Sequence, residues 1–215
     1  REWDYASRYQ MSRETNPKYR DVVPLNTPLL ALHLGREPRF YANIAADRLY
    51  WKRGAYPMPG TEFVQVYQGE RYGSQIDRID PTYRQNLSGY YMKKSLKSNL
   101  SNMENLSYPK EATIVMRLAE LYLMKAEAWN EYEGPVNPDH VYAPLNEVRR
   151  RAGIPDLEIA WTNYSKNPDK IKTKAGMRDV IRQEWNIEFA FEGRRFWNLR
   201  RWLTAADELN VPLYG

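Results

Sequence analysis

The 215-residue sequence lacks cysteine altogether and contains only two histidines, His33 and His140. Without cysteine the chain has no disulfide bonds, thiolate metal sites or cysteine nucleophiles, although this absence fits either a reducing or an oxidising compartment. With two histidines it is poorly supplied for acid–base catalysis. No segment approaches the roughly 18 consecutive apolar residues of a membrane-spanning helix. The chain begins at Arg1 without a signal peptide, which says nothing about where the protein is targeted.

The common catalytic motifs are also missing. The chain contains no Gly-x-Ser-x-Gly elbow, no Gly-x-Gly-x-x-Gly or Walker loop and no His-Glu-x-x-His helix. A carboxylate-bridged metal site in a helical bundle would require Glu-x-x-His, but Leu30 and Asn137 stand three positions before the two histidines. We therefore expect no enzymatic activity, no metal and no other cofactor. The sequence alone does not exclude a glycosidase-like pair of carboxylates, because their separation in space defines that site.

The net charge of +5 and the pI near 9.2 raise the question of nucleic-acid binding. The 32 basic residues are interspersed with 27 acidic ones, and the tight basic cluster at 149–151 lies beside Glu147. A phosphate-binding face would need a patch of one sign, so we do not expect nucleic acid as a partner. Seventeen tyrosines and seven tryptophans against five phenylalanines favour rings with a polar edge, which suit half-buried surfaces and wet binding sites.

The first half of the chain, residues 1–110, has the pattern of a loop-rich segment with short strands that faces the ligand. Prolines and glycines interrupt it repeatedly. The apolar run 29–34 fits either a strand or a brief helix, whereas 39–44 alternates like a strand and 88–94 is expected to form another. Residues 95–110 are rich in Asn and Ser and are expected to form an exposed connection.

The second half, residues 111–215, is expected to form a helical scaffold. Helices are predicted from 113 to a stop at Gly134, from about Pro144 to a stop at Gly153, and from about 175 to 192 with a stop at Gly193. A loop is expected between 157 and 173, and a final amphipathic helix follows Gly193. Both Gly153 and Gly193 are predicted to adopt positive φ. The fold class is therefore mainly α, and the two halves are expected to form one continuous domain.

The first two predicted helices resemble one tetratricopeptide-like hairpin. A single hairpin of this kind cannot bury both of its apolar faces, so it requires neighbouring helices. We therefore expect tetratricopeptide-like helices that support a loop-rich ligand face with short strands.

Acidic residues in this half recur at helical spacing and are accompanied by arginines. Glutamates four or seven residues apart share one face of a helix. Arginines nearby in the sequence favour guanidinium–carboxylate pairs between helices. An arginine lowers the pKa of a neighbouring carboxyl, which is the opposite of what a general acid needs. The residues expected to form structural ion pairs are Glu120, Glu127, Arg149, Arg151, Glu184, Glu188, Glu192, Arg194 and Arg195.

Aromatic residues in the segment 45–91 are the candidate ligand contacts. They alternate with Lys, Arg, Gln and acidic residues in turn-rich sequence. Rings in loops can stack on the C–H face of a sugar while neighbouring polar groups bind its hydroxyls; packing against the edge of a sheet is the alternative. Their irregular spacing suits a shallow groove with several weak subsites. The candidate ligand-binding residues are Tyr50, Trp51, Tyr56, Tyr67 and Tyr72.

Four motifs occur in a specific order along the chain: Pro38-Arg-Phe-Tyr41, Gly89-Tyr-Tyr-Met-Lys-Lys94, the predicted hairpin from Arg117 to Pro155, and Glu192-Gly-Arg-Arg-Phe-Trp-Asn-Leu-Arg-Arg-Trp202. In this order they resemble the C-terminal portion of the SusD/RagB family of outer-membrane nutrient-binding lipoproteins. By this resemblance the chain is expected to be a C-terminal piece, with the N-terminal helical-repeat part of the full protein absent.

The resemblance implies a function as well as a fold. Such proteins capture oligosaccharides, or peptides in some branches, and deliver them to a TonB-dependent, SusC-like transporter. We therefore expect a non-enzymatic glycan-binding subunit on the surface of the outer membrane, anchored by an N-terminal lipid that lies outside this chain. A peptide-binding relative, which the basic charge favours, and a protein-interaction scaffold without a small ligand are the alternatives. The motifs belong to the scaffold and do not name the ligand.

Overall fold

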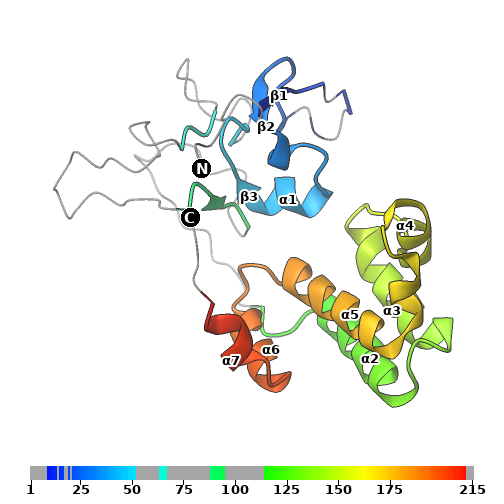
Figure 1. Cartoon of the computed structure of the whole chain (residues 1–215). Coiled ribbons are helices and arrows are strands. Elements are labelled where there is room, and N and C mark those ends of the chain that lie inside the picture. Colours follow the sequence, from blue (N-terminus) through cyan, green and yellow to red (C-terminus); the bar gives the residue numbers. More distant parts are fainter. Residues whose placement is uncertain are drawn as a thin grey trace. The chain divides into compact units, whose positions relative to one another are not determined.

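The computed structural model describes residues 9–13, 15, 16, 19, 21–51, 63–66, 88–94 and 114–211. The chain divides into two compact units. Arg1–Pro109 with Tyr214–Gly215 forms the N-terminal unit, and Lys110–Leu213 forms the helical unit. Figure 1 labels most of the helices and strands of both units. The expectation of one continuous domain stays a prediction.

The N-terminal unit contains two small antiparallel pairs of strands. β1 (Tyr9–Met11) pairs with β2 (Pro28–Leu30), and β3 (Ile44–Ala45) pairs with β4 (Tyr91–Met92). The 3-10 helix η2 (Ala31–His33) and the helix α1 (Pro38–Asn43) connect β2 to β3. A small core holds these elements together and consists of Val23, Leu29, Tyr41, Ala46 and Leu49.

Three expectations for this unit differ from the structure, wholly or in part. The run 29–34 contains both predicted alternatives, because β2 ends at Leu30 and η2 follows it directly. The strand predicted at 39–44 is wrong, since Pro38–Asn43 is a helix. Proline has a backbone φ that suits the first helical position, and Pro38 occupies that position. Of the run 88–94, only Tyr91–Met92 forms a strand. The connection expected at 95–110 lies outside the described residues.

The helical unit consists of successive helices joined by turns (Figure 1). α2 packs against both α3 and α5, which makes it the central helix of the three. The mainly α fold class is confirmed. The elements are α2 (Leu118–Glu133), α3 (Pro138–Arg151), α4 (Leu157–Tyr164), the 3-10 helix η3 (Pro168–Lys172), α5 (Lys174–Glu188), α6 (Arg194–Arg201) and α7 (Ala205–Leu209).

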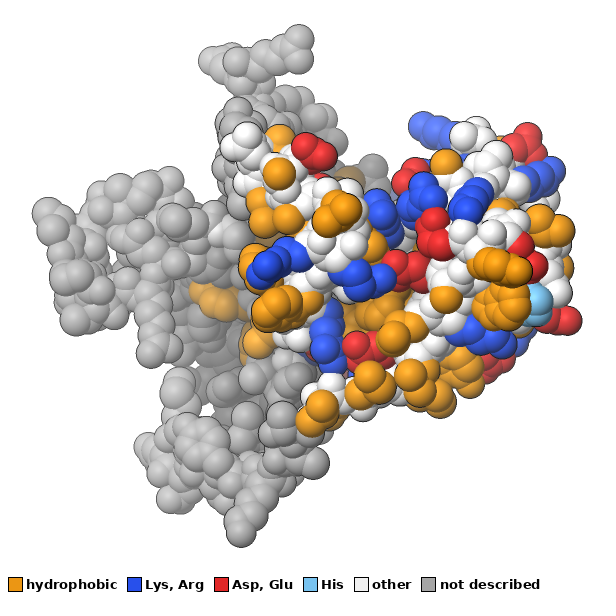
Figure 2. Space-filling model, turned by 90° about the horizontal axis from the view of Figure 1, so that it is seen from below, with side chains coloured by type: hydrophobic (Ala, Val, Ile, Leu, Met, Phe, Trp, Pro, Cys, Tyr) orange, Lys and Arg blue, Asp and Glu red, His pale blue; other side chains and the backbone are white. Residues whose placement is uncertain are grey.

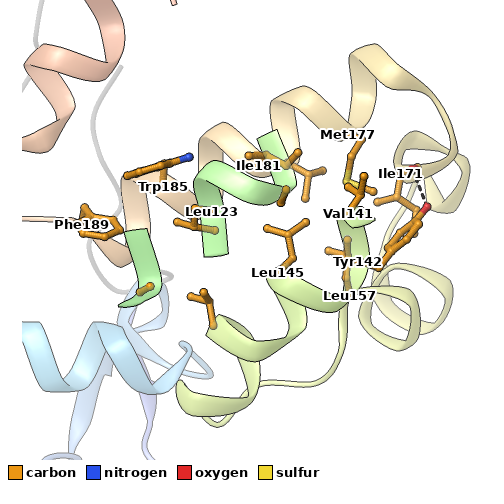
Figure 3. Close-up of a cluster of buried hydrophobic side chains, with 14 of the residues drawn as sticks. Leu123, Val141, Tyr142, Leu145, Leu157, Ile171, Met177, Ile181, Trp185 and Phe189 are labelled. Carbon is orange, nitrogen blue, oxygen red and sulfur yellow. Dashed lines mark hydrogen bonds between the residues drawn. The ribbon is translucent and has the colours of Figure 1, made fainter. Parts of the chain in front are cut away.

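The core of the helical unit lies between α2, α3 and α5 (Figure 3). Leu123 of α2, Leu145 of α3 and Ile181 of α5 are fully buried there. Burying a side chain of this size stabilises a fold by about 1.5–3 kcal/mol. Trp185 and Phe189 lie at one end of the cluster, and at the other end the Tyr142 hydroxyl donates to the Ile171 carbonyl at 2.9 Å.

Several predicted boundaries in this unit are wrong. α3 begins at Pro138 and not near Pro144, because the Asn137 side chain accepts from the Asp139 N–H at 3.0 Å and so caps the helix. Pro144 lies inside α3 and is buried. The loop expected at 157–173 instead contains α4 and η3. α4 is secured at its start by buried Leu157, whose N–H donates to Asn146 Oδ1 at 2.7 Å.

The two glycines expected to adopt positive φ do so, with φ of 74° at Gly153 and 72° at Gly193. Gly153 ends α3 in a Schellman turn, because its N–H donates to the Arg150 carbonyl and the Ile154 N–H to the Arg149 carbonyl. Gly193 has a different role from the one expected. α5 ends at Glu188, and Gly193 precedes the first residue of α6.

Candidate functional site

The candidate ligand-binding rings belong to the N-terminal unit. Tyr50 and Trp51 are both half-buried, whereas Tyr56, Tyr67 and Tyr72 lie outside the described residues. The ring of Tyr50 stacks on Phe63, with ring centroids 4.8 Å apart and planes tilted by 19°. Phe63 is absent from the predicted set. Its partnership with Tyr50 depends on pairing between separate segments of chain, which spacing along the sequence does not reveal.

Backbone pairing holds Tyr50 and Phe63 together. The two residues form an isolated antiparallel bridge, and the Val64 N–H donates to the Leu49 carbonyl at 2.9 Å. Leu49 is fully buried in the small core, so the core anchors the segment that carries the Tyr50 ring. The Tyr50 N–H also donates to the Val22 carbonyl at 2.8 Å. Backbone hydrogen bonds and the small core therefore hold in place the segments that carry the stacked pair.

A second ring contact in the N-terminal unit involves His33 and Tyr90. His33 is buried, and its Nε2 lies 3.1 Å from the hydroxyl of Tyr90, whose ring meets the imidazole edge-on. Burial, and then the positive charge of Arg36, lower the pKa of His33 to about 4. The imidazole is therefore neutral at physiological pH. Its contact with Tyr90 joins η2 to the residue before β4 and is structural.

The residues predicted to form ion pairs all lie in the helical unit, and the structure brings most of them into contact with one another. Glu184 lies 3.3 Å from Arg149, Glu188 lies 2.5 Å from Arg151, and Glu120 lies 3.0 Å from Arg194. These contacts join α5 to α3, and α6 to α2. Glu184 and Glu188 are buried, so their carboxylates depend on these partners for their stability.

The remaining predicted residues pair with residues outside that predicted set. Glu127 accepts from two guanidinium nitrogens of Arg201 and from the indole N–H of Trp202. Arg195 pairs with Glu208 of α7 at 2.8 Å. Glu192 accepts from Arg117.

Arg117 is the centre of this network although it precedes α2. Its guanidinium donates to Glu188 Oε1 at 2.5 Å, to both carboxylate oxygens of Glu192 at 2.8 and 2.9 Å, and to the Glu188 carbonyl at 2.9 Å. It also lies 3.9 Å from the centroid of the Phe189 ring. Burial would lower the pKa of Arg117, but the hydrogen bonds to Glu192 and Glu188 outweigh it and raise the pKa. Arg117 thus stays charged and fastens the start of α2 to the end of α5.

Carboxylates held in this way connect helices. Among the described residues, no group of three or more His, Asp or Glu side chains is placed to hold a metal ion. No helix in the described ranges is both long enough and apolar enough to cross a membrane.

Comparison with known proteins adds to this geometry. The model of the SusD family matches residues 2–215 of the chain. The SusD-like protein P25 of Formosa agariphila is 30% identical over 141 residues, which are 66% of this chain and 24% of that protein. The SusD-like protein P38 of the same organism is 31% identical over 104 residues, 47% of this chain and 19% of that protein. The matched part of the chain thus spans about a quarter of the length of these relatives, or less.

Proposed function

The chain belongs to the SusD family, and on that basis we propose that it is part of a cell-surface glycan-binding protein. In this proposal the full-length protein is held at the outer membrane by an N-terminal lipid. It captures oligosaccharides and passes them to a TonB-dependent, SusC-like transporter. It breaks no bond in the ligand and needs no cofactor.

The observation that carries the glycan proposal is the stacked pair of Tyr50 and Phe63 with Trp51 next to it. A half-buried ring backed by a second ring and by paired backbone offers a rigid apolar surface, which can receive the C–H face of a sugar. The hydroxyls of the sugar would bond to polar groups in the same segment. Tyr56, Tyr67 and Tyr72 would extend this surface into further subsites.

The ion pairs of the helical unit have a structural role in this proposal. Glu184, Glu188 and Glu192 each contact at least one guanidinium, and Glu184 and Glu188 are buried. They hold the helices of the helical unit together, and their replacement should change stability and leave the affinity of the folded protein unchanged. A hydrolysis assay tests the non-enzymatic part. Turnover of a polysaccharide that a single carboxylate substitution abolishes would overturn it.

Isothermal titration calorimetry with oligosaccharide and peptide panels tests the ligand class. A stacked ring contributes about 1–2 kcal/mol and binding orders the ligand, so we expect dissociation constants from roughly micromolar to millimolar. Trp51→Ala and Tyr72→Ala should each weaken glycan binding by about 5- to 20-fold. Tyr164→Ala, which removes an exposed ring from α4, is the matched control and should have no effect.

Two outcomes would redirect the proposal. If Trp51→Ala and Tyr72→Ala both leave glycan affinity unchanged, the ring site is wrong even though the family is established. If peptides bind and no oligosaccharide does, the protein is a peptide-binding relative, an outcome that the net charge of +5 would help to explain.

A further inference from the structure

A half-open cavity of about 330 Å³ lies at the turn between α5 and α6. Three phenyl rings line it, those of Phe189, Phe191 and Phe196, and Arg195 lies among the lining residues. The volume is near the lower limit of small-ligand sites. A cavity of this size has room for one large apolar side chain. It lies at the end of the helical core marked by Trp185 and Phe189 (Figure 3), both of which contribute to its wall.

Exposed aromatic side chains surround this cavity. Phe191 is 52% exposed, Phe196 is 50% exposed and Trp197 is 62% exposed. The rings of Phe196 and Trp197 meet edge to face, with centroids 5.3 Å apart. We call Phe191, Phe196 and Trp197 the aromatic shelf. Large exposed apolar groups gathered around a cavity mark a surface that another molecule covers.

The backbone conformation of Phe191 also indicates that another molecule covers this surface. Its φ is +65°, a left-handed conformation that is unfavourable for a bulky side chain and that proteins normally give to glycine. The chain does use glycine two residues later, at Gly193. Phe191 therefore occupies a strained position while half of its ring faces solvent. The ring contributes less to the fold than a buried phenylalanine would, which points to a contact outside this chain.

Within the described part of the chain, the positive charge of Arg200 beside the shelf is not neutralised by a carboxylate. Three of the four arginines of α6 meet a glutamate, since Arg194 pairs with Glu120, Arg195 with Glu208 and Arg201 with Glu127. The fourth, Arg200, has no carboxylate partner among the described residues. Its guanidinium lies 5.6 Å from the Phe196 ring and 5.8 Å from the Trp197 ring. Hydrophobic and basic side chains also lie next to one another on the face shown in Figure 2.

We propose that the aromatic shelf is a docking surface for an acidic segment of a second protein. One large apolar side chain of that segment enters the cavity, and a carboxylate beside it binds Arg200. Arginine and large aromatic residues are the types that contribute most to protein interfaces, and an uncompensated positive charge selects a negative partner. A sugar would need several polar groups in the wall, and Arg195, the charged residue among those that line the cavity, is already engaged by Glu208. The proposal is independent of the glycan site in the N-terminal unit.

Fluorescence anisotropy with short synthetic peptides tests the proposal on the whole 215-residue chain. Each labelled peptide carries one Phe, Trp, Leu or Met flanked by glutamates. One matched set has glutamine for glutamate, and another has alanine for the apolar residue. At least one acidic peptide should bind saturably, with a dissociation constant of roughly 10 µM to 1 mM. Its glutamine counterpart should bind about 3- to 10-fold more weakly, and R200Q should remove this preference for glutamate.

Two glycine substitutions separate a docking role from a structural one. Phe191→Gly and Leu203→Gly both relieve a left-handed backbone, since Leu203 has φ of +61° and is also exposed, but Leu203 does not line the cavity. Neither change should lower the melting temperature. Phe191→Gly should weaken the best peptide by about tenfold. Leu203→Gly should leave its affinity unchanged, and Phe196→Ala should weaken it.

Several results would overturn the proposal. They are the absence of saturable binding by every peptide, a preference for glutamate that survives R200Q, and a larger loss of melting temperature in Phe191→Gly than in Leu203→Gly. A loss of oligosaccharide affinity in Phe191→Gly would make the shelf a sugar site and overturn it as well. The glycan proposal has its own readout, the effect of Trp51→Ala, so either proposal can fail without the other.

Discussion

Replacing Arg117 with alanine is expected to destabilise the helical unit more than replacing either glutamate that it contacts. The side chain of Glu188 is 1% exposed, and that of Glu192 is 24% exposed. Without Arg117, the buried Glu188 carboxylate keeps Arg151, whose own side chain is 60% exposed. Leaving a buried charge without its partner costs about 3–5 kcal/mol, and because Arg151 remains we expect a loss near the lower end, about 3 kcal/mol.

Replacing either glutamate should cost less stability than replacing Arg117, and Glu188→Ala should cost more than Glu192→Ala. In Glu188→Ala, Arg117 keeps both hydrogen bonds to Glu192 and Arg151 returns to water, so the loss should be about 2 kcal/mol. In Glu192→Ala, Arg117 keeps Glu188 and the lost carboxylate was partly exposed, so the loss should be about 1 kcal/mol. Arg117→Lys should recover little of the stability that Arg117→Ala loses, because an ammonium group cannot reproduce the forked contact with Glu192.

Urea unfolding followed by tryptophan fluorescence measures these differences. Five of the seven tryptophans lie in the helical unit, at positions 129, 161, 185, 197 and 202, so the signal reports mainly on that unit. Lys172→Ala removes an exposed pair with Asp169 and should leave the midpoint unchanged. If Arg117→Ala costs no more than Glu192→Ala, the burial argument is wrong. If any of these variants loses glycan affinity while its midpoint is unchanged, the network is not merely structural.

Three further predictions concern single positions. Gly153→Val and Gly193→Val should each lower the free energy of unfolding by about 1–2 kcal/mol in the same assay, because a β-branched residue tolerates their positive φ poorly; an unchanged midpoint in both would contradict this. Gly176→Ala should destabilise α5 although alanine favours helices, because a Cβ at this position would collide with the Lys170 carbonyl, and a stabilised variant would disprove the contact. Lowering the pH from 6.5 to about 4 should reduce the stability of the N-terminal unit by about 2–3 kcal/mol through His33, because the unfolded chain binds the proton while the folded imidazole, with its lowered pKa, does not. Comparing His33→Gln with the parent chain at both pH values isolates this effect, and equal pH dependence of the two would rule it out.

Local sequence signals predicted the helices better than their ends. Ala119 and Ala126, two helical turns apart, are expected on the inward face of α2 from their spacing in the sequence, and both are buried. The prediction failed at 39–44, because six residues are too few to separate helical spacing from alternation. It also failed at α3 and α4, where the cap by Asn137 and the anchor at Leu157 depend on single contacts. Boundaries of this kind depend on particular hydrogen bonds more than on periodicity.

The sequence by itself determined the helical character of the second half, the left-handed positions at Gly153 and Gly193, and the family to which the chain belongs. These depend on residue types at short spacing, which a chain shows without being folded. Only the tertiary structure decided the partners. Arg117 meets Glu188 and Glu192 across 71 and 75 residues, and Tyr50 meets Phe63 through backbone pairing of separate segments. A charge or a ring can pair with any complementary group that the fold brings within reach, so spacing along the chain cannot select the partner. The same holds for Arg200, which has no carboxylate partner among the described residues although the other three arginines of α6 each pair with one.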